Sequence, residues 1–233
     1  MRAYLLETPP QDVFDHMALD EAVLDRAPKE REDCWLRVYS WSGPPPWAVT
    51  FGCSQTYESV AEAVRRRYGG VTLPLVRRST GGGIVYHEDD LTFSFVFPWR
   101  RMTAPAEIYR GIHLGLHAGL KARGLRSRLW NVPSARAPQE CFTAPEATDL
   151  VHEDGTKFVG GALRRRRERG LYQGSMRTER FADRSRLVEA LLEGFSLQWR
   201  VVFDSTGPDA AVAAAAKLLR AEKYAKDVWN QRR

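Results

Sequence analysis

Hydrophobic side chains recur at helical spacing in several segments of the chain. The clearest case follows Pro105, which suits the first turn of a helix. Four aliphatic residues recur there every four positions and define one apolar face: Ile108, Ile112, Leu116 and Leu120. Further helices are predicted over three segments: 57–70, which a glycine closes, 185–195 and 208–225.

Residues 11–27 predict a further amphipathic helix near the N-terminus. Val13, Met17 and Leu24 lie on one helical face. Asp20 interrupts this apolar stripe, although the spacing of the other residues still favours a helix.

Short runs of β-branched and aromatic residues predict strands between these helices. Residues 34–41 and 47–52 read as strands that flank the turn SGPPP. Two more strands flank the turn signal Asp154-Gly155 within residues 148–163. The remaining predicted strands are 72–79, which leads into a glycine-rich loop, Thr92 to Phe97, and 170–176.

The order of these elements predicts the fold class. Strands occur in hairpin-like pairs with helices between the groups, and the proline-rich segment 128–146 is predicted as loop. We therefore predict an α+β fold with a mixed, largely antiparallel central sheet and flanking helices. No Gly/Ser-rich linker divides the 233 residues, so we predict that residues 1–233 form one domain.

Charge and cysteine content narrow the possible partners and the compartment. The net charge is +6, and a basic surface of this kind favours an acidic partner. No helix-turn-helix, zinc or RNA-binding motif is recognisable, which argues against nucleic acid. Three cysteines, Cys34, Cys53 and Cys141, do not suggest a disulfide framework and favour a reduced, cytoplasmic setting. The N-terminus lacks a signal-peptide pattern, and no run of about 18 apolar residues predicts a membrane span.

Three consecutive glycines lie within RRSTGGGIVYHEDDLTFSF, residues 77–95, and form the main candidate for a binding loop. Glycines let backbone N–H groups approach a ligand, and converging N–H groups make a concave anion site. Arg77 and Arg78 add positive charge beside it. A tight hairpin that uses glycine only to turn is the alternative. The stretch lacks the Gly-Lys-Ser/Thr of nucleotide hydrolases and the G-x-G-x-x-G spacing of dinucleotide-binding folds.

This stretch resembles the R-R-x-[ST]-G-G-G-x-V-x-H signature of the biotin/lipoate protein ligase superfamily, which includes lipoate–protein ligases and octanoyltransferases. Four other segments resemble motifs of that family, in the family's order: MALDEAVL, LRVYSWSGPPPWAVTFGCSQ, TKFVGGALRRRRERGLYQGSM and EKYAKDVWNQRR. The resemblance implies a single catalytic domain of this type over residues 1–233. It implies a fold like that of class II aminoacyl-tRNA synthetases and biotin ligases, with the glycine loop lining an acyl-binding tunnel.

Cys141 is the candidate nucleophile. The segment CFTAP followed by GTKFVGGA resembles the C-F-x-x-P…G-x-K-x-x-G-x-A arrangement of the cysteine-type octanoyltransferases. The resemblance implies that Cys141 takes an octanoyl chain from acyl carrier protein as a thioester and passes it to a lysine of a lipoyl domain. Taken alone, a cysteine is more often a small buried hydrophobe, and we keep that interpretation for Cys34 and Cys53.

Lys157 is the candidate partner of the thiol. It matches a family lysine that contacts the acyl carbonyl or an adenylate phosphate. Positive charge near a thiol favours the reactive thiolate, and Lys157 is the best candidate in the sequence for that charge. Without the motif, a lysine at a hairpin end more often lies in solvent.

The resemblance assigns substrate binding to the glycine loop and to the segments that match the lysine and H-G motifs. The residues are Arg77, Arg78, Ser79, Thr80, Gly81, Gly82, Gly83, His87, Gly160, Gly161, Ala162, Gln173 and Gly174. The sequence departs from the family twice here. The usual G-S-A is Gly160-Gly161-Ala162, and the usual H-G pair is Gln173-Gly174. Glutamine does not titrate, so this position can only hydrogen-bond.

Titratable residues after the glycine loop have a structural and a chemical interpretation. His87 could act as a base or hold the loop through hydrogen bonds, and we favour the structural role. The acids Glu88, Asp89 and Asp90 are predicted to form a solvated turn.

Two other patterns of titratable residues are candidates for a site. His113 and His117 are spaced i, i+4, but the sequence HLGLH lacks the Glu and the third ligand of a metal site, so no metal is predicted. The run RRRRER, residues 164–169, is either a solvated strand end or a docking patch for acidic carrier proteins.

Three hypotheses for function follow. The first is an octanoyltransferase that needs no cofactor, takes its chain from octanoyl–acyl carrier protein and modifies a lipoyl domain or the glycine cleavage H protein. A variant of it moves acyl groups between two lipoyl domains. The second is a lipoate–protein ligase that needs ATP and Mg²⁺ and forms lipoyl-adenylate. Such ligases commonly carry an additional C-terminal domain, which favours the first hypothesis.

The third hypothesis is a non-catalytic acyl-carrier or nucleic-acid binding protein, in which Cys141→Ala changes nothing. We favour the first hypothesis, with no nucleic acid and no membrane among the partners.

Overall fold

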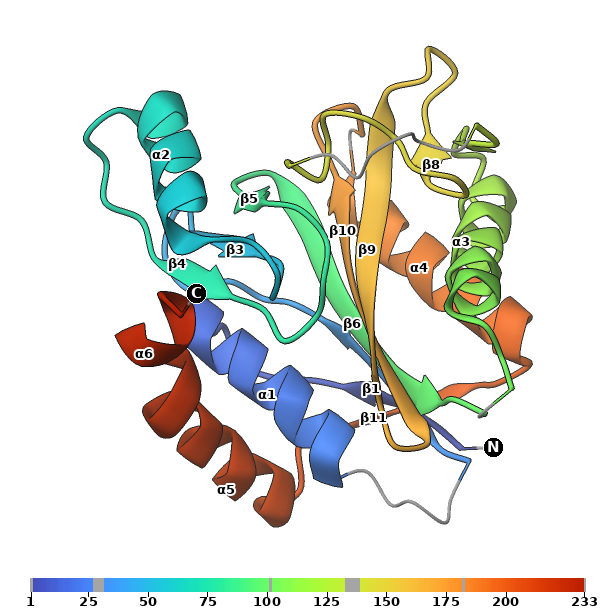
Figure 1. The fold of residues 1–233 in the computed structure, drawn as a ribbon. Coiled ribbons are helices and arrows are strands. Elements are labelled where there is room, and N and C mark those ends of the chain that lie inside the picture. The colour runs from blue at the N-terminus through green and yellow to red at the C-terminus, as the bar shows by residue number, and fades with distance from the viewer. Residues whose placement is uncertain (1, 27–31, 101, 133–138, 182, 233) are drawn as a thin grey trace.

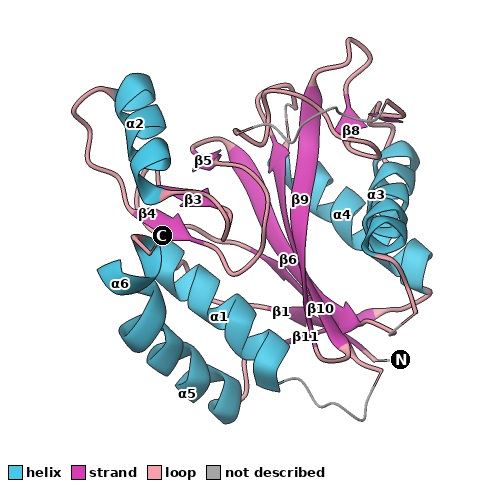
Figure 2. Ribbon diagram, in the orientation of Figure 1, coloured by secondary structure: helices cyan, strands magenta, loops and turns pink. Residues whose placement is uncertain are grey.

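The structure is a computed structural model that describes residues 2–26, 32–100, 102–132, 139–181 and 183–232. Helices lie on both sides of a large sheet, and a smaller sheet lies beside it (Figure 1). Figure 2 shows the same arrangement coloured by element type. Part of the predicted loop 128–146 falls on residues 133–138, which lie outside the described residues.

The large sheet is mixed and largely antiparallel. Its strands, in spatial order, are β11 (Phe203–Thr206), β1 (Ala3–Leu6), β2 (Cys34–Val38), β6 (Asp90–Pro98), β10 (Arg169–Arg177), β9 (Lys157–Arg166), β8 (Leu150–Val151) and β7 (Arg128–Leu129). β1 runs parallel to β2 and β11, and the other neighbouring strands are antiparallel. The α+β prediction is therefore confirmed, including the two strands around Asp154-Gly155.

The small sheet carries the glycine loop. Its strands, in spatial order, are β4 (Leu75–Arg77), β3 (Ala48–Phe51) and β5 (Val85–His87). β3 is parallel to β4 and antiparallel to β5, so the loop of residues 78–84 crosses from one edge strand to the other. This crossing brings the loop beside β9 and β10, where Gly82 faces Ala162 and Thr80 hydrogen-bonds to Gln173.

The helices follow the predicted segments closely. They are α1 (Val13–Arg26), α2 (Tyr57–Tyr68), α3 (Pro105–Ala122), α4 (Arg184–Trp199), α5 (Ala210–Leu219), a π-helical turn (Arg220–Tyr224) and α6 (Asp227–Asn230). α3 begins at Pro105 as predicted, and Gly69 with a φ of 65° ends α2. Among the described residues, no helix combines the length and apolar character that crossing a bilayer requires.

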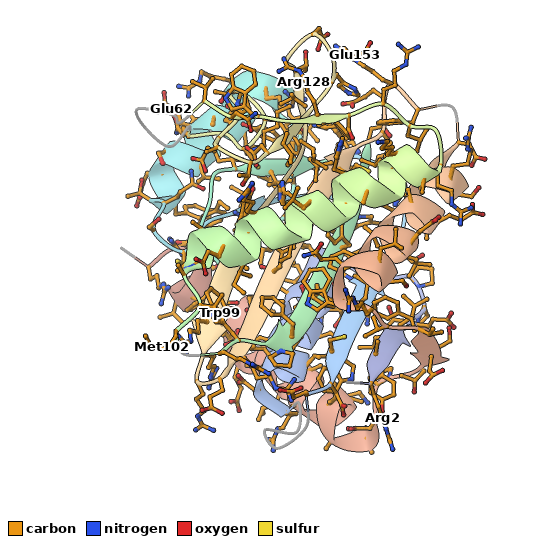
Figure 3. All side chains as sticks on the ribbon, turned by 90° about the vertical axis from the view of Figure 1, so that its right-hand side faces the viewer. Arg2, Glu62, Trp99, Met102, Arg128 and Glu153 are labelled. Carbon is orange, nitrogen blue, oxygen red and sulfur yellow. The ribbon has the colours of Figure 1, made fainter. Side chains whose placement is uncertain are left out.

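The two faces of the large sheet differ in polarity, because residues alternate between the faces along each strand. On the face that α3 and α4 cover, Phe93 and Phe95 of β6 pack with Ile112 and Leu116 of α3. Figure 3 looks onto this side, with α3 crossing in front. The opposite face lies toward α1 and the small sheet. Over part of β6 and β10 its positions are buried but polar: Asp90, Thr92, Ser94, Gln173 and Ser175. Farther along the same face, Val96 and Leu171 are apolar and pack with α1.

Three sequence-based predictions differ from the structure. The segment 128–146, predicted as loop, begins with the short strand β7, which pairs with β8. The strands predicted over 34–41 and 47–52 exist as β2 and β3, but they do not pair with each other. β2 is placed by β1 and β6 in the large sheet, and β3 belongs to the small one. The predicted solvated turn of Glu88, Asp89 and Asp90 is also wrong in part, because Asp90 is 1% exposed and begins β6.

Burial of His113 in α3 predicts a loss of stability in acid. His113 is fully buried, its Nε2 lies 2.7 Å from the Tyr172 hydroxyl, and burial lowers its pKa to about 4. The imidazole stays neutral in the folded chain, whereas the unfolded chain takes up a proton below pH 6.5. The free energy of unfolding is therefore expected to fall by up to about 3 kcal/mol as the pH drops from 6.5 to 4.

Denaturant unfolding across this pH range tests the prediction. His113→Gln should flatten the dependence, because glutamine does not titrate. His117→Gln on the same helix is the matched control, since His117 is only partly buried. Equal flattening by both variants, or by neither, would contradict the assignment to His113.

Candidate active site

A small cavity lies between the glycine loop, α1 and the polar face of β9 and β10. Its volume is about 30 Å³, which is room for about two water molecules. The predicted site residues that line it are Arg78, Gly82, Gly83, His87, Cys141, Gly160, Gly161, Ala162, Gln173 and Gly174. Met17, Tyr39, Thr50, Val85, Thr92 and Ser175 complete the lining. An eight-carbon chain is larger than this volume.

Cys141 and Lys157 meet at Gly160. A Cβ built on Gly160 would lie 2.7 Å from Lys157 Nζ and 3.2 Å from Cys141 Sγ, so both atoms lie within 3.2 Å of one point. The missing side chain of Gly160 therefore leaves the space in which the thiol and the ammonium come together. Sequence resemblance had paired these two residues, and the fold brings them into proximity from a loop and a strand.

Lys157 is held by a buried ion pair. Its Nζ lies 2.7 Å from Asp149 Oδ2, and both side chains are almost fully buried. Asp149 also accepts hydrogen bonds from the Tyr109 hydroxyl at 2.6 Å and the Glu146 backbone N–H at 2.7 Å. Burial lowers the pKa of Lys157, but negative charge on Cys141 and on Asp149 outweighs burial and raises it above its usual value. Lys157 is therefore a fixed cation beside the thiol.

Arg78 is a second buried cation at the cavity. Its NH1 donates to Thr50 Oγ1 at 2.9 Å, and its NH2 donates to the Gly81 and Gly83 carbonyls, each at 2.8 Å. Burial lowers its pKa to about 10, while negative charge on Cys141 acts in the opposite direction. Within the described residues no carboxylate forms an ion pair with Arg78, so its charge remains available to a negative group in the cavity.

The Cys141 loop is attached to the segment that follows the glycines. The Cys141 backbone N–H donates to the Ile84 carbonyl at 2.9 Å, and the Ile84 N–H donates to the Gln139 carbonyl at 2.9 Å. Gln55 Nε2 also donates to the Gln139 carbonyl, at 3.0 Å. The Cys141 loop and the segment that follows the glycines are therefore joined by hydrogen bonds.

The glycine loop packs against Gly52, in the turn after β3, and this contact leaves no room for a side chain there. Gly82 has a φ of 84°, a conformation that favours glycine. A Cβ on Gly52 would lie 2.0 Å from the Gly82 carbonyl oxygen and 2.9 Å from the Gly81 carbonyl carbon. Because both neighbours are backbone, Gly52→Ala must displace the loop.

Gly52→Ala is therefore expected to lower the free energy of unfolding by about 1–3 kcal/mol. Gly70→Ala is the matched control, since a Cβ there meets nothing within 4 Å and should change stability by less than about 0.5 kcal/mol. Denaturant unfolding of both variants checks the prediction. Equal stability of the two would show that the loop does not pack on Gly52 as described.

Five predicted site residues lie outside the cavity lining: Lys157 and the four residues Arg77, Ser79, Thr80 and Gly81. Arg77 donates to backbone carbonyls of Cys53, Gln55 and the C-terminal segment, including Asn230 O at 3.0 Å and Arg232 O at 2.7 Å. It therefore joins the C-terminus to the turn after β3. The other three lie elsewhere in the loop: Ser79, whose carbonyl accepts from Arg164, Thr80, whose hydroxyl donates to Gln173, and Gly81.

Gln173, which stands where the family has histidine, connects the loop to the sheet and α1. Its Oε1 accepts from the Thr80 hydroxyl at 2.7 Å, and its Nε2 donates to Asp20 Oδ2 at 2.7 Å. Asp20 also accepts hydrogen bonds from Arg37, Tyr39 and Ser94. The acid that interrupts the apolar stripe of α1 is therefore the centre of a buried network.

Sequence reasoning missed several residues that shape the site. In the sequence, Asp20 stands out only because it interrupts the apolar face of the predicted N-terminal helix. Nothing in the sequence around Asp149 or Tyr109 indicates that they contribute to the site. Gln55 could have been found from the sequence, because it is the last residue of the G-x-x-Q motif. Thr50, which lies between Arg78 and His87, could not have been.

No metal-binding cluster of three or more His, Cys, Asp or Glu side chains occurs in the part of the chain that the structure describes. The two helical histidines bind different partners. His113 pairs with Tyr172, and His117 Nδ1 lies 2.8 Å from the Ser127 hydroxyl.

Comparison with known proteins relates this geometry to a family. The model of the lipoyl protein ligase A/B catalytic domain matches residues 12–194. Octanoyltransferase LipM of Staphylococcus aureus is 31% identical over 185 residues, which cover 73% of this chain and 64% of that protein. Octanoyltransferase LipM of Geobacillus kaustophilus is 29% identical, and the alignment covers 94% of each chain. The chain thus spans slightly less than two thirds of the S. aureus relative's length.

A solved structure shares the fold. Lipoate-protein ligase A with bound ATP superimposes with a TM-score of 0.82 over 99% of both chains, at 22% identity. At this identity the likeness concerns the fold, which confirms the predicted architecture.

Proposed function

This chain belongs to the lipoyl protein ligase A/B catalytic domain family, and we propose that it is an octanoyltransferase that carries its acyl group on Cys141. The relatives named Octanoyltransferase LipM support this activity. The observation that carries the proposal is the position of Cys141, which lines the cavity and whose Sγ lies beside Gly160, near Lys157.

The first step exchanges one thioester for another. The Cys141 thiolate attacks the carbonyl carbon of octanoyl–acyl carrier protein and forms a new S–C bond. The bond from that carbon to the carrier's sulfur then breaks, and the carrier leaves as a thiolate. Because a thioester is consumed and a thioester is formed, no ATP is needed. Lys157 and Arg78 would stabilise the attacking thiolate.

The second step forms an amide. A neutral lysine amine of the acceptor attacks the carbonyl carbon of octanoyl-Cys141, the S–C bond breaks, and the amine proton is lost as Cys141 returns to thiolate. The carbonyl oxygen gains negative charge in both steps and needs donors. Among the described residues nothing accepts a hydrogen bond from the Gly82 or Gly83 N–H, so both groups are available for this role together with Lys157.

The proposed donor is octanoyl–acyl carrier protein, and the proposed acceptor is a lipoyl domain or the glycine cleavage H protein. The hairpin between β9 and β10 carries the basic run 164–169 and offers a positive docking patch to such acidic partners. Part of this positive charge is neutralised by acids of the same chain, since Arg166 forms an ion pair with Asp25 at 2.8 Å.

A lipoate–protein ligase is the alternative, because the ATP-bound ligase shares the fold over nearly the whole chain. That activity would require ATP and Mg²⁺ and would place an adenylate beside Lys157. An adenylate, like an octanoyl chain, is larger than the cavity described above.

A transfer assay separates the two activities. The chain is mixed with a lipoyl domain and either octanoyl–acyl carrier protein alone or lipoate with ATP and Mg²⁺, and the acceptor mass is measured. Modification in the first mixture is the expected result. Modification only in the second would overturn the octanoyltransferase proposal in favour of the ligase.

A further inference from the structure

A buried row of hydrogen bonds runs from Asp90 to Arg78 along the wall of the cavity, which Thr50, His87 and Arg78 line. Asp90 Oδ2 lies 3.0 Å from His87 Nδ1, His87 Nε2 lies 2.9 Å from Thr50 Oγ1, and Arg78 NH1 lies 2.9 Å from the same Thr50 oxygen. These four side chains are at most 5% exposed. They come from β6, β5, β3 and the start of the glycine loop.

The two ends of this row are fixed by their other contacts. A guanidinium can only donate, so the Thr50 oxygen accepts from Arg78. The two ring nitrogens of His87 lie between Thr50 and Asp90. Asp90 is held in place by two more donors, the Thr92 and Ser175 hydroxyls, each at 2.7 Å. The row therefore holds Thr50 in place from the side opposite to Arg78.

The row ends on the cation that shapes the glycine loop. The other side of the Arg78 guanidinium binds the Gly81 and Gly83 carbonyls, so Thr50 and the loop hold the group from two sides. A buried guanidinium that is surrounded by neutral acceptors is costly unless a negative group lies near it. Cys141, which lines the same cavity, supplies such a group when it is a thiolate.

We propose that Thr50 is a positioning residue: with His87 and Asp90 behind it, its hydroxyl holds the charge of Arg78 beside Cys141. The proposal rests on the proposed role of Cys141 as the acyl carrier. It assigns to Thr50, His87 and Asp90 an effect on thiol reactivity that reaches Cys141 through Arg78.

The test compares Thr50→Val with Thr50→Ser. Valine has nearly the same shape but removes the hydroxyl, whereas serine keeps it. The readout is the rate constant for alkylation of Cys141 by iodoacetamide, measured by peptide mass so that Cys53 is counted separately. We expect Thr50→Val to slow alkylation of Cys141 by about tenfold or more, as the loss of a hydrogen bond to a charged group suggests, and Thr50→Ser to restore most of the rate.

A double-mutant cycle asks whether the effect passes through Arg78. The Arg78→Lys background lacks the guanidinium that donates to Thr50. In that background, Thr50→Val should slow alkylation of Cys141 by less than about twofold. An undiminished effect of Thr50→Val in that background would overturn the proposal, as would equal alkylation rates in Thr50→Val and the unmodified chain. If Thr50→Val does not fold, Thr50→Ala, which also removes the hydroxyl, replaces it in the same two backgrounds and is judged by the same outcomes.

Failure of this proposal is distinguishable from failure of the proposed function. Alkylation needs no acyl donor, so slow alkylation in Thr50→Val supports the positioning role even if no octanoyl adduct forms. In single-turnover transfer, the acylation rate should fall in Thr50→Val while the half-saturating donor concentration stays within about twofold, because the buried side chains of the row are out of reach of a carrier protein docked at the surface. A change confined to half-saturation would contradict the proposal.

Discussion

Cys141→Ser is expected to reduce octanoyl transfer by at least about a thousandfold. A serine hydroxyl is not deprotonated at neutral pH, and its ester with octanoate is a poorer acyl donor to an amine than a thioester is. Cys141 is only partly buried, and the substitution exchanges its sulfur for an oxygen of similar position. The free energy of unfolding should therefore change by less than about 0.5 kcal/mol. Transfer rates to a lipoyl domain, measured beside denaturant unfolding, check both parts.

Cys53→Ser is the matched control for this variant. Cys53 is also a partly buried, free cysteine, and it lies on the turn that contacts the glycine loop. It should keep most of the activity, because the proposed carrier is Cys141. Comparable losses in both variants would indicate that serine disturbs the loops and would remove the support for a specific nucleophile.

Lys157→Met is expected to lose both activity and stability, for separable reasons. Removing the cation beside the thiol and the developing oxyanion should slow transfer by about 10²–10³-fold. The same change leaves Asp149, whose side chain is 0% exposed, without its ion-pair partner, which should cost about 3–5 kcal/mol. Transfer rates and denaturant unfolding measure the two effects.

The double variant Lys157→Met/Asp149→Asn separates them. The amide oxygen of asparagine can still accept from the Tyr109 hydroxyl without a buried charge, so a large part of the lost stability should return. Transfer should stay slow, because the cation is still absent. Recovery of transfer together with stability would show that Lys157 matters only for folding.

Patterns with a short range in sequence predicted much of the fold. The stripe of α3 and the turn at Asp154-Gly155 depend on residues a few positions apart, and both are present in the structure. The partner of a strand depends instead on contacts between distant segments. For this reason β2 and β3 were recognised as strands, while their membership of different sheets was not.

The site was predicted to a similar extent. Motif resemblance placed Cys141, Lys157 and the glycines together, and the cavity contains or adjoins them. It could not distinguish Arg77 from Arg78, although adjacent side chains on an extended segment point to opposite sides. Arg78 lies at the cavity and Arg77 holds the C-terminal segment.

Buried polar residues were the hardest to predict. Asp20 and Asp90 look like surface acids in sequence, because nothing nearby in the chain announces their partners. Their donors, Gln173 for Asp20 and Ser175 for Asp90, are more than 80 residues away. Only the folded sheet brings these groups together.

The most direct test of the account is intact-protein mass spectrometry of the chain after mixing with octanoyl–acyl carrier protein in the absence of ATP. The account predicts a gain of one octanoyl group that hydroxylamine removes and that Cys141→Ser does not acquire. Two results would contradict a thioester on Cys141: the chain gains no acyl group from an intact donor, or the Cys141→Ser variant gains the same group.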